Sequence, residues 1–499
     1  MGAKQRARLD TWSRVDGKRT PPDPEVARAA FARKAPDEIP RIVKAHKAWM
    51  VAMVRGANLG RETGAAILRA LCEVDIDAIV ATYDPRFNKP ILQLERYLCD
   101  QVGDAASNVL AGRTLPPPLY RMKARESILP LIDAVLELRR TLLDVAAQHT
   151  RTVMPGYTHL SHAQPMTYGH YLVGLHDAVA RAGGEIERAY AATNRCNMGC
   201  GALAGTSFRI DRGLLAELLG FDGLIEHAND CVAATDFAID LVAALTNLLI
   251  PISRVANELD VWTTFEAGML EVSDAVGATS SMMPQKKNAT LCEHLRAGLG
   301  AVMGYYAELA CQAHNTSYGD TMEVMFNYWK VPEIAAKGVW ACEQMATLVT
   351  NLSVNEAVML RHAREGFSTA SELAAVLLRE RGTPWRVAHA IVAGVVRRLV
   401  QAGKTAADIT PQIVDEVAAE VAGAPLGLSA EAIRAAIDPA RFVEAMTSQG
   451  GAAPTETERM IEARREELAR DRGGQAERVR RLTDAEARLD VAVREIVES

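Results

Sequence analysis

The sequence predicts an all-α protein of three consecutive helical domains, with a bundle of long helices at its centre. Only 5% of the 499 residues are aromatic although 49% are hydrophobic, a composition that favours packed helices over sandwiches or barrels. Apolar residues recur with a period near 3.6 over long segments such as 128–149 and 166–194, as expected of bundle helices. Clusters of proline and glycine separate these segments into groups and indicate domain boundaries.

The N-terminal part begins with a charged segment, residues 1–22, which ends at Pro21-Pro22. We expect this segment to be flexible, and it lacks the apolar stretch of a secretory signal. Residues 23–115 form the predicted N-terminal helical domain, with helical patterns at 39–53, 63–81 and 91–102. Three consecutive prolines after Leu115 remove backbone donors and fix φ, so we expect no helix to continue there and place a domain boundary.

Residues 116–365 form the predicted central long-helix bundle domain. Its helices are expected at 128–149, 166–194, 236–265, 298–316 and 331–352. Pro251 should kink the third of them. Because the apolar faces of helices this long exceed what one chain covers, we expect a homo-oligomer rather than a monomer.

The C-terminal part has shorter helical patterns. Residues 366–454 form a predicted small helical domain, in which glycine or proline sets off the segments 369–381 and 385–402. Residues 455–499 form a helical tail rich in Glu and Arg. Its polar character predicts a helix that faces solvent or a partner.

Charge, hydropathy and cysteine usage exclude several classes of function. A net charge of −6 and a pI near 6.1 do not favour binding to nucleic acid or to an anionic membrane surface. The most apolar window, 237–252, is interrupted by Asp240, Thr246 and Asn247, so we expect no membrane span. The eight cysteines contain no CxxC pair, which favours free thiols in a reducing cytoplasm over a metal cage. We expect no metal and no other cofactor.

One polar loop, residues 277–288, lies between two long apolar-periodic segments. Its Gly-Ala-Thr-Ser-Ser start is small and polar, which indicates a mobile loop. We expect Ser281, Lys287 and Asn288 just before or within the first turn of the following helix, where free N–H groups and the helix dipole favour negative charge. Such a loop suits an anionic substrate that must be enclosed. The alternative is an ordinary polar loop with a solvated lysine pair.

A second segment, 154–165, reads Met-Pro-Gly-Tyr-Thr-His-Leu followed by Ser-His-Ala-Gln-Pro. Pro155-Gly156 is a turn signal, so Thr158 and His159 should be presented at one end of the bundle. A histidine beside a hydroxyl can relay a proton at neutral pH. The alternative is that both side chains satisfy backbone groups at a helix end.

The sequence motifs in these two segments resemble those of a known family. Thr279 to Asn288 resembles the signature loop of the fumarase/aspartase superfamily, and the Gln-Lys-Lys-Asn ending is most similar to its argininosuccinate lyase branch. Further similar segments are found at 154–165, 199–212, 230–237, 367–370 and 448–451. The resemblance covers residues 37–454 and implies a three-domain all-α fold, a small dicarboxylate substrate, and a homotetramer whose active sites are shared between subunits.

The resemblance also implies roles for individual residues. Ser281 would be the base that removes a proton from the carbon beside a carboxylate, and Thr158 would help to stabilise the resulting dianion. His159, oriented by Glu293 from another segment, would help to protonate the leaving nitrogen. The implied substrate-binding residues are Lys287, Asn288, Ser280, Met283, Arg113, Thr114 and Gln164.

Three departures from the family pattern concern the substrate. An expected Arg-Asn pair is replaced by Leu115-Pro116, a Gln and a Lys by Gly319 and Met322, and an Asp-Arg pair by Ala234-Thr235. Each lost hydrogen bond to a charged group typically costs about 1.5–3 kcal/mol. We therefore expect poor recognition of argininosuccinate with the elimination chemistry intact.

The sequence thus predicts a carbon–nitrogen lyase that cleaves an N-substituted aspartate by β-elimination, releasing fumarate and an amine. Two alternatives remain open: a genuine argininosuccinate lyase, and a catalytically silent homologue with a structural role. Retention of Ser281, Lys287, Asn288, Thr158 and His159 together argues against the silent homologue.

Overall fold

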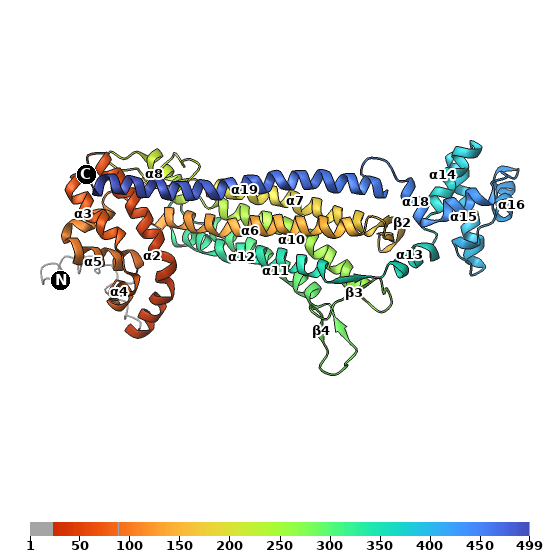
Figure 1. The fold of residues 1–499 in the computed structure, drawn as a ribbon, viewed down its shortest axis with the longest axis horizontal. Helices are drawn as coiled ribbons and strands as arrows, with labels where there is room; N and C mark the ends of the chain where they lie inside the picture. Colours follow the sequence, from red (N-terminus) through yellow and green to blue (C-terminus); the bar gives the residue numbers. More distant parts are fainter. Residues whose placement is uncertain (1–22, 88, 115, 499) are drawn as a thin grey trace.

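The computed structural model describes residues 23–87, 89–114 and 116–498. The predicted flexible segment 1–22 and Leu115 lie outside the described residues. The molecule is elongated, with an N-terminal helical unit at one end, a bundle of long helices in the middle and a small helical unit at the other end (Figure 1). The predicted all-α fold is confirmed, apart from three short two-stranded sheets.

The N-terminal unit packs around α2 (Pro24–Arg55), which buries Trp49 completely. The pattern at 63–81 is not one helix, as its periodicity suggested, but two, α3 (Arg61–Cys72) and α4 (Ile76–Ala81). The division follows from Asp75, whose carboxylate accepts a hydrogen bond from the Ala78 backbone amide at 3.1 Å and caps the new helix. The unit is completed by α5 (Pro90–Val102) and the 3₁₀ helix η2 (Asp104–Leu110).

The bundle consists of α6 (Pro116–Gln148), α7 (Tyr168–Thr193), α10 (Asp236–Trp262), α11 (Thr290–Ala313) and α12 (Met322–Thr350). No helix continues through the prolines, as expected: η2 ends at Leu110 and α6 begins anew at Pro116, ahead of the residue 128 at which its apolar pattern begins. Proline is favoured in a first helical turn, where its missing N–H has no partner in any case. Among the described residues, α10 alone is apolar and long enough for a membrane span, but it packs against α7, α11 and α12 as a core helix does.

Short elements connect these helices. The strands β1 (Val153–Thr158) and β2 (Ser161–Thr167) form one hairpin, and β4 (Ala278–Thr279) and β5 (Lys287–Asn288) form another. β3 (Leu270–Val272) pairs antiparallel with β6 (Leu352–Val354). Two short helices, α8 (Arg212–Leu219) and α9 (Asp230–Ala233), lie between α7 and α10 in the chain.

The C-terminal unit has its own core, to which Leu377, Ile391 and Val414 contribute fully buried side chains. It follows α13 (Glu356–Glu365), which contacts β1. Its elements are α14 (Ala370–Arg381), α15 (Trp385–Gln401), η3 (Ala406–Asp408), α16 (Pro411–Ala422), α17 (Ala430–Ile437) and α18 (Pro439–Ala445).

The charged tail is a helix that packs one face on the rest of the chain and leaves the other face exposed to solvent. It forms α19 (Pro454–Val497), which runs back along the bundle to the N-terminal unit (Figure 1). Leu468 joins the bundle core and Val493 the N-terminal core. Its arginines and carboxylates pair with the bundle: both Arg464–Asp177 contacts and the Arg139–Asp471 contact are 2.6 Å long. Some of the charges that suggested a solvent-facing helix therefore attach α19 to α6 and α7.

Candidate active site

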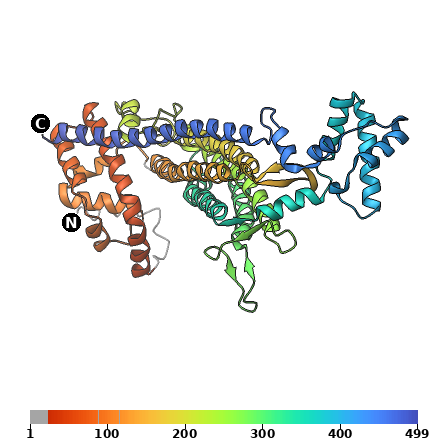
Figure 2. The ribbon, with the colours of Figure 1, turned by 45° about the vertical axis from the view of Figure 1, so that its right-hand side comes forward.

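The residues that the sequence singles out lie in three places on the chain. Arg113 and Thr114 follow η2 beside the N-terminal unit, whereas Thr158 and His159 lie at the opposite end of the bundle, on the β1–β2 hairpin. The segment 280–288 belongs to the β4–β5 hairpin, which projects from the side of the bundle (Figures 1 and 2). A single chain therefore does not bring the three groups together.

Ser281 lies at the exposed tip of the β4–β5 hairpin. The expectation that it lies next to a helix N-terminus was wrong, since α11 begins only at Thr290. The two ends of the loop pair with each other instead, Ala278 with Asn288, and the Asn288 side-chain amide donates to the Ala278 carbonyl at 3.2 Å. Lys287 and Asn288 do lie directly before α11, as expected.

Ser280 shapes the tip of this hairpin. Its hydroxyl accepts hydrogen bonds from the backbone amides of Met282, at 3.3 Å, and Met283, at 3.0 Å. Within the described residues the Ser281 hydroxyl has no such hydrogen bond. Met282, at the same tip, is 88% exposed.

Lys287 is held by acidic residues outside the loop. Its ammonium group lies 2.7 Å from Glu271 and 2.8 Å from Asp274. These two carboxylates, Asp274 most strongly, raise the pKa of Lys287, so the side chain is charged at neutral pH. A substrate carboxylate must compete with them, but exposed ion pairs are weak and exchange readily.

The β1–β2 hairpin presents Thr158 and His159 to solvent. Its turn is formed by His159 and Leu160, at φ values of 53° and 61°, the left-handed conformation of a type I′ turn. Neither residue is glycine, so each carries strain of about 1–3 kcal/mol, as often found at functional sites. Pro155-Gly156 is not the turn that the sequence suggested: the strand register shifts there, between Pro155 and Tyr157.

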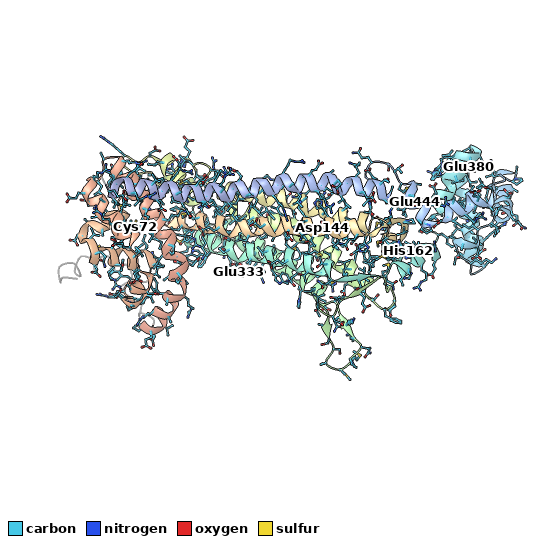
Figure 3. All side chains as sticks on the ribbon, viewed as in Figure 1. Cys72, Asp144, His162, Glu333, Glu380 and Glu444 are labelled. Carbon is cyan, nitrogen blue, oxygen red and sulfur yellow. The ribbon has the colours of Figure 1, made fainter. Side chains whose placement is uncertain are left out.

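Aromatic contacts anchor this hairpin to the rest of the molecule. The Tyr157 ring lies 5.2 Å from that of His162 and 6.2 Å from that of Trp262 at the end of α10. His162 in turn lies 6.4 Å from His362 on α13. Figure 3 places His162 at the end of the bundle that faces the C-terminal unit. Gln164, on the same hairpin, is exposed like His159.

Arg113 turns into the N-terminal unit. Its guanidinium packs over the Trp49 ring at 5.2 Å, donates to the Val109 carbonyl at 3.0 Å and contacts the His46 imidazole. Burial lowers its pKa to about 9, and no carboxylate pairs with it in the part of the chain that the structure describes. The adjacent Thr114 is half-buried.

Glu293 lies in the first turn of α11, exposed and without an ion-pair partner among the residues described. Reasoning from sequence missed Glu271 and Asp274, the partners of Lys287, although both precede the loop closely in the chain. It also missed Tyr318, in the segment where the family's polar residues are lost. The Tyr318 hydroxyl donates to Asp230 at 2.6 Å.

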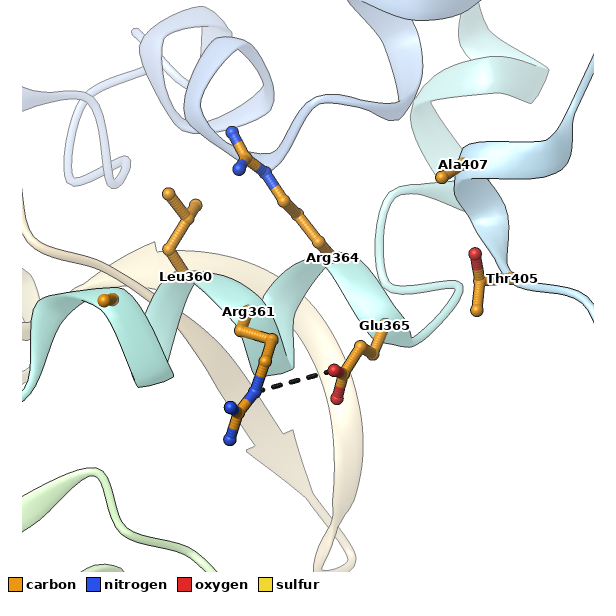
Figure 4. A pocket seen from close by; sticks show the side chains of 7 residues that line it. Leu360, Arg361, Arg364, Glu365, Thr405 and Ala407 are labelled. Atoms are coloured by element: carbon orange, nitrogen blue, oxygen red, sulfur yellow. Dashed lines mark ion pairs between the residues drawn. The ribbon is translucent and has the colours of Figure 1, made fainter.

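Two surface cavities lie away from these residues. A cavity of about 360 Å³ lies between α13 and the η3 region, where Arg361 forms an ion pair with Glu365 and Arg364 lies nearby (Figure 4). A second, of about 130 Å³, lies between α6, α7 and α19. Neither is lined by a site residue predicted from the sequence.

Within the described ranges, no group of three or more His, Cys, Asp or Glu side chains could hold a metal ion.

The chain matches two known families. The family described as Lyase matches residues 119–304, and the one described as Argininosuccinate lyase C-terminal matches residues 367–444. The argininosuccinate lyase of Methanoculleus marisnigri is 35% identical over 434 residues, which cover 85% of this chain and 86% of the relative. That of Methanosarcina barkeri is 34% identical over 83% of this chain and 84% of the relative.

Solved structures share the fold. A variant of EDDS lyase with bound fumarate is 30% identical, covers 93% of each chain and has a TM-score of 0.84. The 3-carboxy-cis,cis-muconate lactonizing enzyme from Pseudomonas putida, at 19% identity and a TM-score of 0.69, shares only the fold; the match covers 89% of this chain and 97% of that enzyme. The chain therefore belongs to the fumarase/aspartase superfamily, in its argininosuccinate lyase-like branch, and is a fumarate-forming carbon–nitrogen lyase.

Proposed function

We propose that the enzyme cleaves the C–N bond of an N-substituted aspartate other than argininosuccinate, releasing fumarate and an amine. The observation that carries this proposal is the loss of polar groups at Leu115-Pro116 and at Gly319 and Met322. Met322 is 50% exposed at the start of α12, so an apolar side chain stands where the family has a lysine. The likeness to EDDS lyase over 93% of both chains supports a substrate other than argininosuccinate.

In the proposed reaction, Ser281 removes a proton from the carbon next to a substrate carboxylate. The electron pair moves onto that carboxylate and forms a dianion, which the charged Lys287, the Asn288 amide and the Thr158 hydroxyl stabilise. Collapse of the dianion breaks the C–N bond. His159, oriented by Glu293, gives a proton to the leaving nitrogen.

The proposed active unit is a homotetramer with shared sites. Exposed apolar side chains on the bundle support it, because a soluble monomer rarely leaves so many uncovered: Ile250, Met303, Tyr306, Phe326 and Trp329 are each 40–54% exposed. The separation of the three site groups on one chain supports it as well. We also infer a cytoplasmic location, since all eight cysteines are free.

The test is an absorbance assay for fumarate, run in the addition direction with a panel of amines and in the cleavage direction with argininosuccinate. We expect fumarate to be consumed with at least one amine, and no measurable cleavage of millimolar argininosuccinate. The Ser281→Ala variant is the blank for both arms. Argininosuccinate turnover near the value of ordinary enzymes, about 10 s⁻¹, would overturn the proposal and establish the genuine argininosuccinate lyase, the activity named for the sequence relatives.

A further inference from the structure

Two cysteines share a small buried cluster near α8, at the N-terminal end of the bundle (Figure 1). Cys200 is 3% exposed and Cys231 is fully buried, and Val232 packs with both. Cys200 belongs to a glycine-rich loop, 199–205, whose residues 202–205 are exposed. Cys231 belongs to α9. The pair therefore lies at the base of a surface loop, with Cys200 in the loop and Cys231 packed in the same cluster.

A single cation lies against this pair. The guanidinium of Arg212 is 3.2 Å from the Cys231 sulfur. Its other contacts are backbone carbonyls, those of Met198 at 3.0 Å, Ile225 at 2.7 Å and Glu226 at 2.9 Å. No carboxylate pairs with Arg212 within the described residues. A thiolate at Cys231 would be the one anion next to this charge.

The pKa values of the two thiols are shifted in opposite directions. A hydrogen bond from Cys200, followed by the charge of Arg212, lowers the pKa of Cys231, and the same hydrogen bond with burial raises the pKa of Cys200. Burial raises the pKa of both Cys292 and Cys342 to about 12. Since the thiolate is the reactive form, Cys231 is suited to react first and Cys200 to react second.

We propose that Cys200 and Cys231 form an oxidisable dithiol that hydrogen peroxide converts into a reversible intramolecular disulfide. The Cys231 thiolate attacks one peroxide oxygen, the O–O bond breaks, and with one proton from solvent the products are a sulfenic acid and water. The Cys200 thiol then attacks the Cys231 sulfur, the S–O bond breaks and water leaves. The two thiols lose two hydrogen atoms in all, and one peroxide is reduced to two waters. Peroxide is small enough to reach a site beneath a loop.

Closure of this disulfide acts on a second loop. The residues before Cys231 hold Tyr318: the Asn229 amide donates to the Tyr318 carbonyl at 3.1 Å, and the Tyr318 hydroxyl donates to Asp230 at 2.6 Å. A disulfide bond that pulls α9 toward the glycine-rich loop stretches and weakens these two hydrogen bonds. The proposed disulfide therefore loosens the connection between α11 and α12, residues 314–321.

The experiment uses the full chain with the exposed Cys72 and Cys311 replaced by serine. Peroxide is added at neutral pH, and peptides are mapped by mass spectrometry without reduction. We expect a peptide pair linked through Cys200 and Cys231, formed at least about ten-fold faster than any oxidation of Cys342 and reversed by dithiothreitol. Hydrogen exchange in residues 314–321 should become faster on oxidation and recover on reduction.

A second variant keeps the test decisive. In Cys200→Ser the linked pair is lost and the sulfenic acid at Cys231 accumulates, where dimedone traps it. The matched control, Cys292→Ser, removes another buried thiol and should leave the rate of disulfide formation unchanged. If Cys231 stays reduced while Cys342 is oxidised at the same rate or faster, the dithiol proposal is wrong. An oxidised protein with unchanged exchange at 314–321 would contradict the proposed effect on the loop.

Discussion

The two hairpins that carry the proposed catalytic groups are built in different ways. The β1–β2 hairpin has strands of six and seven residues and is anchored through Tyr157 to Trp262. The β4–β5 hairpin has two strands of two residues, projects from the bundle, and leaves its tip exposed (Figure 2). Its local contacts are the Ser280 turn and the ion pairs of Lys287.

This difference suggests that the two hairpins have different functions, one in positioning a side chain and the other in enclosing the substrate. An anchored hairpin with a strained turn keeps His159 in one place before the substrate arrives. A short projecting hairpin with few buried contacts opens and closes at low free-energy cost, as a loop that encloses a substrate must. Substitution of Ser281 or His159 should therefore affect the chemistry directly, whereas a substitution in the β1–β2 strands should act through the position of His159.

The largest effect is expected for Ser281→Ala. Loss of the proposed base should lower kcat by about a thousand-fold, within the ~10²–10⁴-fold range of general base catalysis. The exposed tip makes no packing contacts that the fold depends on, so the circular dichroism spectrum and the oligomeric state should not change. The fumarate assay measures the loss. Ser353→Ala, an exposed serine on β6, is the matched control and should keep full activity.

The next experiment tests whether the two hairpins of one chain serve different sites. Ser281→Ala and His159→Ala should each be nearly inactive alone. Mixing them under mild dissociation and reassociation should restore part of the activity, because some sites would then receive a wild-type hairpin of each kind. Native mass spectrometry must show mixed tetramers. Mixed tetramers without activity would mean that Ser281 and His159 of one chain serve the same site.

The two hairpins also show what could be predicted from the sequence. Long helices such as α7 could be predicted from the period of their apolar residues. The family resemblance could be recognised because the signature residues are contiguous in the sequence. The two-residue strands β4 and β5 are too short for any period, so the loop at 277–288 could not be recognised as a hairpin. The turn at His159-Leu160 uses residues that rarely adopt positive φ, and Pro155-Gly156 offered a stronger but misleading turn signal.

Contacts between distant parts of the chain could not be predicted from the sequence for a different reason. Arg113 packs on Trp49, and α19 packs along helices that precede it by about three hundred residues. A charged helix in solvent and one that pairs its charges with a bundle have the same composition. Only the packing of Leu468 and Val493 into two separate cores distinguishes them.

A moderate effect is expected for Gly156→Ala on the anchored hairpin. An added Cβ would lie 2.5 Å from the Gln164 carbonyl oxygen, so the strands must separate. We expect the free energy of unfolding to fall by about 1–3 kcal/mol and kcat to fall with it, because His159 is displaced.

The control for this change is Gly174→Ala in α7, where a Cβ meets nothing within 4 Å. There alanine should stabilise the helix by about 0.5–1 kcal/mol. Denaturant unfolding and the fumarate assay measure both variants. Unchanged stability and kcat in Gly156→Ala would show that the β1–β2 hairpin is as adaptable as β4–β5.

The smallest effect is expected for Glu271→Gln, which removes one of the two carboxylates that hold Lys287. Asp274 remains at 2.8 Å and keeps the ammonium group charged. With less competition from the protein, a substrate carboxylate should bind Lys287 more readily, so KM should fall while kcat stays within about two-fold. Stability should change by no more than about 0.5 kcal/mol, as for most exposed sites.

Steady-state kinetics separates KM from kcat. The control is Glu266→Gln, at an exposed glutamate nearby in the chain, which should change neither. A rise in KM for Glu271→Gln would show instead that Glu271 orients Lys287 toward the substrate, and that the projecting hairpin is preorganised after all.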